Sequence, residues 1–291
     1  MRKSISLRAF PPGMPTLRRA EMARDAGFDG VEVNLERTED VDLFSSPEDL
    51  KALRRDIEAL GLVVSAVYCR DQWHHPITSQ NTATRQAGIR IVEQLVHAAA
   101  HLGADNVLVL PGAVDNRIFV NPPEIVPYAV AYRNAQAALR ELAHGPAAAA
   151  GVHLAIENVW NKFLLSPLEF ARFVDEIESP WASAYFDVGN VLRYGFPDDW
   201  IRILGPRIVN VQVKDFRRDV DTLAGFVGLL QGDVDWPAVR LALEEIGYDR
   251  WLTSEVLPAY QFHSERLIYE TSAAMDAIFQ PNGAHSARRM Q

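Results

Sequence analysis

Four segments of the chain end in an oxygen-bearing side chain directly after a short apolar run; the four residues are Glu157, Asp187, Gln212 and Glu255. Carboxylates are costly where a strand leaves a hydrophobic core, unless they are paired or bind a metal. Carboxylate and amide oxygens are the ligands that hard divalent cations prefer. If the four ends converge, we expect one divalent cation, Mn²⁺ first, with Mg²⁺, Co²⁺ or Zn²⁺ as alternatives. The other interpretation is four separate capping or salt-bridging groups.

Strand-like and helix-like segments that could position these residues alternate along the whole chain. Ser46-Pro47-Glu48-Asp49 and Ser166-Pro167-Leu168-Glu169 each combine a helix cap, a proline and an early acid, which is typical of a helix start. Long helices are expected near residues 15–26, 123–143 and 264–279. We count about eight strands and eight helices, and strands joined by crossover helices pair in parallel.

This pattern predicts an α/β fold, namely a single (β/α)₈ TIM barrel over residues 1–280, followed by a disordered tail at 281–291. The 291 residues suit one barrel of roughly 250 residues with extensions. No glycine-rich dinucleotide turn or P-loop occurs, which disfavours a doubly wound sheet. Active sites of such barrels lie at the C-terminal ends of the strands. In the segment 209–214 the valines are expected to face the helices, whereas Asn210, Gln212 and Lys214 face the barrel interior.

Composition and charge restrict the function classes. The formal net charge of -9 disfavours nucleic acid as a partner, because phosphate backbones require a basic face. The single cysteine, Cys69, excludes an intrachain disulfide and fits a reducing compartment. No apolar run approaches the ~20 residues of a membrane helix, and the N-terminus lacks a signal-peptide pattern. We therefore expect a cytoplasmic protein without a membrane or nucleic-acid partner; a homo-oligomer is left open.

Several motifs resemble the sugar isomerase and epimerase superfamily, which is the xylose-isomerase-like TIM barrel group. The motifs are residues 157–163 (ENVWNKF), 186–190 (FDVGN), 213–215 (VKD) and 232–236 (GDVDW). The nearest branch is similar to the pentulose- and hexulose-phosphate 3-epimerases and related keto-sugar epimerases. The resemblance implies that Glu157, Asp187, position 212 and Glu255 hold one divalent metal. Gln212 stands where most of that branch has histidine, although hydroxypyruvate-isomerase-like members use glutamine there.

The resemblance also implies the chemistry. A metal acting as a Lewis acid stabilises the enediolate formed by deprotonation next to a carbonyl, and Glu157 and Glu255 serve as base and acid on opposite faces. The expected function is a metal-dependent epimerase or isomerase of a keto-sugar or sugar phosphate. Alternatives are an aldose-ketose isomerase of the hydroxypyruvate-isomerase type and a non-catalytic sugar-binding relative. An endonuclease IV-like site is disfavoured, because histidine-rich strand ends and a basic groove are lacking.

Six further residues are candidates for contact with the sugar. Glu32 ends the second strand, Trp73 lies in the loop after the third, and Asn190 belongs to one of the motifs. Trp160 is a candidate apolar lid over the sugar. Lys214 and Arg218 could bind a hydroxyl, carboxylate or phosphate group, and a solvated basic turn is the structural alternative. Ordinary packing or ion pairing is the alternative for the others.

Overall fold

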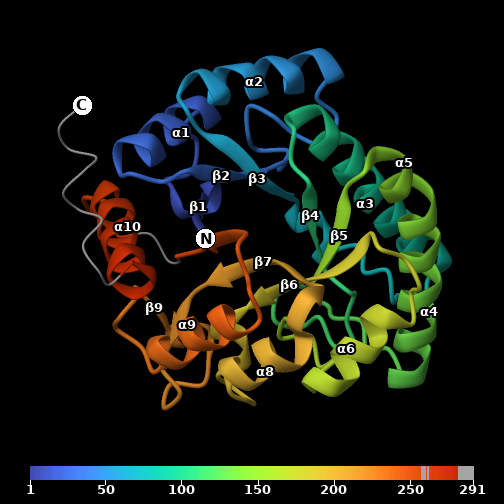
Figure 1. Ribbon diagram of the computed structural model, residues 1–291. Coiled ribbons are helices and arrows are strands. Elements are labelled where there is room, and N and C mark those ends of the chain that lie inside the picture. The colour runs from blue at the N-terminus through green and yellow to red at the C-terminus, as the bar shows by residue number, and fades with distance from the viewer. Residues whose placement is uncertain (257–259, 261, 281–291) are drawn as a thin grey trace.

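The computed structural model describes residues 1–256, 260 and 262–280. Eight strands pair in parallel and close into a barrel in the order β1-β10-β7-β6-β5-β4-β3-β2 (Figure 1). The prediction of a TIM barrel is thereby confirmed. The barrel strands are β1 (Arg2–Ser6), β2 (Gly30–Asn34), β3 (Val63–Tyr68), β4 (Asn106–Val109), β5 (His153–Glu157), β6 (Ala182–Asp187), β7 (Ile208–Val213) and β10 (Trp251–Ser254). The predicted tail at 281–291 lies outside the described residues.

Figure 1 shows the helices arranged around the outside of the strands. The longer helices are α1 (Thr16–Asp25), α2 (Pro47–Ala59), α3 (Thr82–Leu102), α4 (Tyr128–Leu142), α6 (Pro167–Asp175), α8 (Pro197–Leu204), α9 (Trp236–Glu245) and α10 (Glu265–Phe279). Short helical segments are α5 (Ala148–Ala150) and α7 (Val188–Val191). The helix expected near residue 123 begins only at Tyr128, after the prolines of this segment.

A two-stranded antiparallel hairpin, which the sequence did not predict, follows β7. It consists of β8 (Asp215–Phe216) and β9 (Phe226–Val227). The hairpin belongs to the long connection between β7 and α9. Residues on this connection line the cavity described below.

Side-chain alternation in β7 directs polar groups into the barrel. Val211 and Val213 pack in the core beneath the helices, whereas Asn210 and Gln212 are buried and polar. Val209 departs from the expected pattern, because it packs with Ala155 and Tyr185 in a second cluster. The register between β6 and β7 shifts at this point, with Ala184 paired to Ile208 and Tyr185 to Asn210. The extra residue of β7 explains the exception.

The barrel closes where β1 pairs with β10, and α10 supports this seam. Lys3 of β1 forms an ion pair with Asp276 of α10, with an Nζ–Oδ1 distance of 2.5 Å. The same ammonium donates to Ser272 Oγ at 3.0 Å. In the part of the chain that the structure describes, no helix is both long and apolar enough to cross a membrane.

Candidate active site

A cavity of about 740 Å³ opens at the ends of the barrel strands. Its volume lies within the range typical of small-molecule sites. Aromatic side chains form much of its wall, namely Phe10, Tyr68, Trp73, Phe119, Trp160 and Phe226. Polar and charged side chains also line it, among them Arg8, Glu36, Arg70, Glu157, Asn190, Gln212, Lys214 and Glu255. The cavity therefore combines apolar walls with a polar group at the strand ends.

The four predicted cation ligands all lie at this end of the barrel. Glu157 and Asp187 are the last residues of β5 and β6, Gln212 lies near the end of β7, and Glu255 directly follows β10. Each is 6% exposed or less. Strand pairing places Asp187 beside Gln212, because these two residues are register partners. The convergence expected from the strand ends is thus present in the structure.

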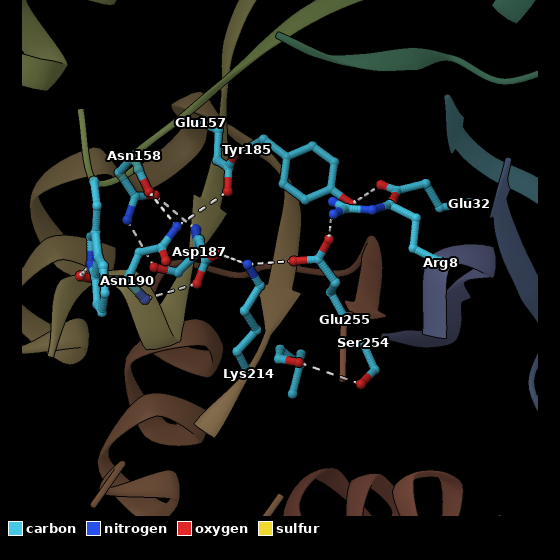
Figure 2. Close-up of polar contacts among 12 residues, drawn as sticks. Arg8, Glu32, Glu157, Asn158, Tyr185, Asp187, Asn190, Lys214, Ser254 and Glu255 are labelled. Atoms are coloured by element: carbon cyan, nitrogen blue, oxygen red, sulfur yellow. Dashed lines mark hydrogen bonds and ion pairs between the residues drawn. The ribbon is translucent and has the colours of Figure 1, made fainter. Parts of the chain in front are cut away.

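Lys214 lies between two of these carboxylates (Figure 2). Its Nζ is 2.8 Å from Oδ2 of Asp187 and 2.5 Å from Oε2 of Glu255. Arg8, which follows β1, binds the other oxygen of Glu255, with an Nη1–Oε1 distance of 2.7 Å. Glu255 therefore has a cation on each of its oxygens. Sequence reasoning missed Arg8, although a cation just after a barrel strand was a usable signal.

The two glutamates have opposite electrostatic surroundings. Burial raises the pKa of Glu157 well above its ordinary value; Lys214 opposes this shift, while Asp187 and Glu255 add to it. Burial also disfavours the charge of Glu255, but Lys214 and Arg8 outweigh it and hold the pKa of Glu255 below its ordinary value. Pairs of carboxyl groups whose environments separate their pKa values are typical of acid and base partners. Glu157 is thus suited to carry a proton and Glu255 to accept one.

Two asparagines hold the carboxylates in place. Asn190 donates its side-chain amide to Glu157 Oε1 at 3.2 Å, and its backbone N–H to Asp187 Oδ1 at 2.9 Å. Asn158 and the backbone of Asp187 exchange two hydrogen bonds of 2.7 and 2.8 Å. Trp160 donates its indole N–H to the carbonyl of Asn190 at 2.9 Å. Asn190 and Trp160 therefore both line the cavity and contribute to one network.

The donor chemistry of the four residues fits a divalent cation. Gln212 Oε1 is buried and has no hydrogen-bond partner among the described residues, which leaves a buried acceptor oxygen unsatisfied. Three neighbouring carboxyl groups supply further oxygen ligands of the kind that hard divalent cations prefer. The oxygens of Glu157, Asp187 and Glu255 do not all lie within 4.8 Å of one another, and Lys214 stands between two of them. These side chains would hold a cation after Lys214 moves aside.

A second group of ligand-type side chains lies near the cavity mouth. Ligand atoms of Glu36, Cys69 and Asp71 lie within 4.8 Å of one another. Glu36 lines the cavity and also accepts a hydrogen bond from the backbone of Arg70 at 3.1 Å. Burial raises the pKa of the Cys69 thiol to about 12, so the thiolate that a metal requires is disfavoured. The four-oxygen set is therefore the stronger candidate.

The remaining predicted contact residues are placed differently. Trp73 is buried in the cavity wall, with its ring centroid 4.4 Å from that of Phe119. Glu32 is buried among the strands, where it accepts a hydrogen bond of 2.7 Å from the Tyr185 hydroxyl (Figure 2). Among the described residues, the set that lines the cavity includes neither Glu32 nor Arg218. The Arg218 guanidinium lies 5.4 Å from the ring centroid of Phe196.

The family model for xylose isomerase-like TIM barrels matches residues 20–277. The chain belongs to this family. L-ribulose-5-phosphate 3-epimerase UlaE of Escherichia coli K12 is 26% identical over 255 residues, which cover 83% of this chain and 82% of that protein. The resemblance predicted from the sequence motifs is therefore confirmed. As predicted, this xylose isomerase-like barrel is an enzyme of the isomerase class.

Two solved structures have the same fold as this xylose isomerase-like barrel. The structure of L-ribulose 3-epimerase has a TM-score of 0.78 and 21% identity, and it covers 100% of this chain and 99% of its own. The structure of the IolI protein with a bound zinc atom has a TM-score of 0.79 and 15% identity, with 98% and 100% of the two chains covered. At these identities the similarity establishes the fold.

Proposed function

We propose that this xylose isomerase-like barrel is a divalent-cation-dependent epimerase of a keto-sugar or keto-sugar phosphate. The observation that carries the proposal is the oxygen of Gln212, which has no partner among the described residues and lies beside three carboxyl groups at the barrel mouth. A protein interior retains such a group when a ligand satisfies it. The epimerase activity of the relative UlaE supports the reaction type. We propose Glu157, Asp187, Gln212 and Glu255 as ligands, and Mn²⁺ as the cation.

The proposed chemistry assigns different roles to the two glutamates. Glu255, whose pKa is lowered by Lys214 and Arg8, takes the proton from the carbon next to the carbonyl. Glu157, whose pKa is raised by burial, returns a proton to the opposite face. When bound, a divalent cation stabilises the negative charge that develops on the substrate oxygen. Asn190 fixes Glu157 through its side-chain amide, so that the carboxyl is oriented before the substrate arrives.

The aromatic walls have a separate task. Trp73 and Trp160 lie on the cavity wall, and Phe226 packs against Trp160 with ring centroids 5.1 Å apart. Such surfaces contact the apolar faces of a sugar ring and exclude water from the reacting carbon. We propose Trp73 and Trp160 as sugar contacts on this ground. The remote guanidinium of Arg218 gives no comparable support for a substrate role.

An aldose-ketose isomerase of the hydroxypyruvate-isomerase type is the second candidate. Gln212 favours it, because that group resembles this chain in using glutamine at the same position. The two reactions share the cation and the glutamates, and they differ in whether the proton returns to the same carbon or to its neighbour.

The single, buried Cys69 supports a reducing compartment, and we propose the cytoplasm.

The test is proton exchange in D₂O, followed by NMR with the Mn²⁺-loaded enzyme and a panel of ketoses, ketose phosphates and keto-glycosides. We expect deuterium on the carbon next to the carbonyl, with inversion at that carbon. Glu157→Gln and Glu255→Gln should each slow exchange by about 10²-fold or more. Glu244→Gln, on the surface of α9, is the matched control and should retain the wild-type rate. Exchange at the wild-type rate in both active-site variants would refute the roles of the two glutamates. Deuterium on the former carbonyl carbon, together with aldose product, would favour the isomerase.

A further inference from the structure

The side chain of Lys214 fills the space that a bound cation would use. Its ammonium contacts Asp187 and Glu255, which come from different strands, and only 13% of its side chain is exposed (Figure 2). Both contacted oxygens belong to residues proposed above as cation ligands. A divalent ion bound to the same two oxygens would lie within a few ångströms of the ammonium, where two positive charges repel strongly. The two cations are therefore alternative occupants.

We propose that Lys214 is a tethered occupant of the cation site, which neutralises Asp187 and Glu255 in the metal-free enzyme and must leave before a divalent cation binds. This inference rests on the proposed function, because it assumes that the four oxygens form a cation site. The ammonium then stabilises the empty site against the mutual repulsion of its carboxylates.

One contact of the ammonium does not depend on the two carboxylates. Lys214 Nζ lies 5.4 Å from the ring centroid of Phe226, on the cavity wall. A lysine side chain has four flexible carbons, so rotation about its own bonds can turn the charge toward this ring. The backbone of Lys214 need not move, and it is held by close packing against Gly189, where an added Cβ would meet the Lys214 Cβ at 2.8 Å. Displacement therefore turns the ammonium toward the open cavity.

Accessibility of the lysines provides a direct test in the wild-type protein. The chain has four lysines, at positions 3, 51, 162 and 214. Lys51 and Lys162 are exposed and serve as labelled controls, whereas Lys3 is buried in its ion pair with Asp276 and serves as a protected control. The protein is treated briefly with an amine-acylating reagent, with EDTA or with MnCl₂, and labelling is read by peptide mass spectrometry. Manganese binding is measured in parallel by calorimetry.

We expect Lys214 to be protected in EDTA and labelled about tenfold or more faster after Mn²⁺ binds, while the three controls remain unchanged. If Mn²⁺ binds and Lys214 stays protected, the inference fails while the cation site stands. If Lys214 is labelled as fast as Lys51 in EDTA, the inference also fails. If no Mn²⁺ binds, the cation of the proposed function and this inference are both refuted.

The affinity of a variant provides the second measurement. A site that is occupied by the ammonium for nine-tenths of the time binds its ligand about tenfold more weakly than a free site does. Lys214→Met should therefore bind Mn²⁺ about tenfold or more tightly, and its metal-free form should melt at a lower temperature than the wild type. Lys51→Met, on the exposed face of α2, is the matched control and should change neither value. An unchanged or weaker affinity in a folded Lys214→Met variant would overturn the proposal.

Discussion

Gln212 is the residue at which stability and cation binding should respond in opposite ways. A buried acceptor without a partner costs about 1–3 kcal/mol, so Gln212→Leu should not lower the stability of the metal-free protein. The same change removes a proposed ligand, and we expect the Mn²⁺ affinity to fall by about tenfold or more. Calorimetric titration and urea unfolding in EDTA measure the two quantities.

Asn210 is the matched control, because it precedes Gln212 on the same inward face. Its side chain accepts a hydrogen bond of 2.9 Å from Thr253 and donates one of 3.4 Å to Asn106. Asn210→Leu should therefore lower the unfolding free energy by about 1–3 kcal/mol and leave the Mn²⁺ affinity unchanged. If Gln212→Leu behaved like Asn210→Leu in both measurements, Gln212 would be a structural residue and not a ligand.

Glu32 is expected to make stability depend on pH. Burial raises its pKa, and the hydrogen bond from Tyr185 offsets this only in part. The folded protein therefore retains a proton that the unfolded chain loses above about pH 4.5. The stabilisation is complete below that pH and is lost as the pH rises toward the folded pKa. The stability of Glu32→Gln relative to the wild type should accordingly increase with pH and then level off.

Urea unfolding in EDTA across a pH series checks this prediction. Glu58→Gln, on the surface of α2, controls for the loss of one carboxylate and should stay within about 0.5 kcal/mol of the wild type throughout. A relative stability of Glu32→Gln that decreases with rising pH would contradict the prediction. It would mean that Arg8, which lowers the pKa of Glu32, outweighs burial.

The placement of Glu157, Asp187, Gln212 and Glu255 at the strand ends could be predicted, because two simple rules of barrel geometry determine it. Parallel barrel strands bring their C-terminal ends together, and alternation decides which side chains face inward. The direction of the Arg218 side chain could not be predicted in this way, because Arg218 lies on a loop whose conformation depends on contacts with residues further along the chain. Its backbone N–H binds Asp233, and the neighbouring Arg217 binds the carbonyl of Gln231. The contact between Lys214 and Glu255 also depends on side-chain conformation, which periodicity does not encode.

At the scale of elements, Asp215 connects β7 to the loop that covers the cavity. Its buried carboxylate accepts four hydrogen bonds: from the backbone of Phe216, Leu230 and Val234 and from the indole of Trp236. In Asp215→Asn the side-chain NH₂ group replaces one of the two acceptor oxygens, so some of these N–H groups lose their acceptor. We expect a loss of about 3 kcal/mol in local stability and faster amide exchange across 217–230.

Hydrogen exchange read by mass spectrometry tests this role of Asp215. Asp235 gives the matched control, because its side chain caps α9 by accepting from the backbone of Ala238 at 3.0 Å. Asp235→Ala should cost about 1 kcal/mol and leave exchange across 217–230 unchanged. Equal exchange in wild type and Asp215→Asn would show that the loop is held by other contacts. The wall residue Phe226 lies on this loop, so a loosened loop should also raise KM more than it lowers kcat.

Element boundaries followed from local signals, whereas irregular segments did not. The start of α2 is encoded by Ser46, whose hydroxyl accepts a hydrogen bond from the backbone of Asp49. The hairpin of β8 and β9 has strands of only two residues, too short for any periodicity to be visible. The inward position of Val209 depends on the register of β6 against β7, which is a tertiary property. Sequence patterns thus predict where regular elements lie, and long-range contacts decide the exceptions.

At the scale of the whole molecule, the barrel separates stability from chemistry. The cavity lies at the C-terminal ends of the strands, whereas the pair of Lys3 and Asp276 lies near the start of β1 on the outside of the barrel. In such barrels the C-terminal ends of the strands carry the active site, and the opposite end contributes to the stability of the fold. A substitution at the closing seam should therefore change global unfolding without changing the site.

Lys3→Met is the substitution that tests this separation. It leaves Asp276, whose side chain is only 20% exposed, without its ion-pair partner, and we expect a loss of about 2 kcal/mol or more in unfolding free energy. The double variant Lys3→Met/Asp276→Leu should recover much of this loss, because apolar replacement of a buried pair is often neutral. Both variants should bind Mn²⁺ with wild-type affinity. Urea unfolding measures the stability of the variants, and calorimetry measures their Mn²⁺ affinity. A weakened Mn²⁺ affinity in the double variant would show that the seam and the site are coupled. The barrel would then transmit strain from β1 through β10 to Glu255.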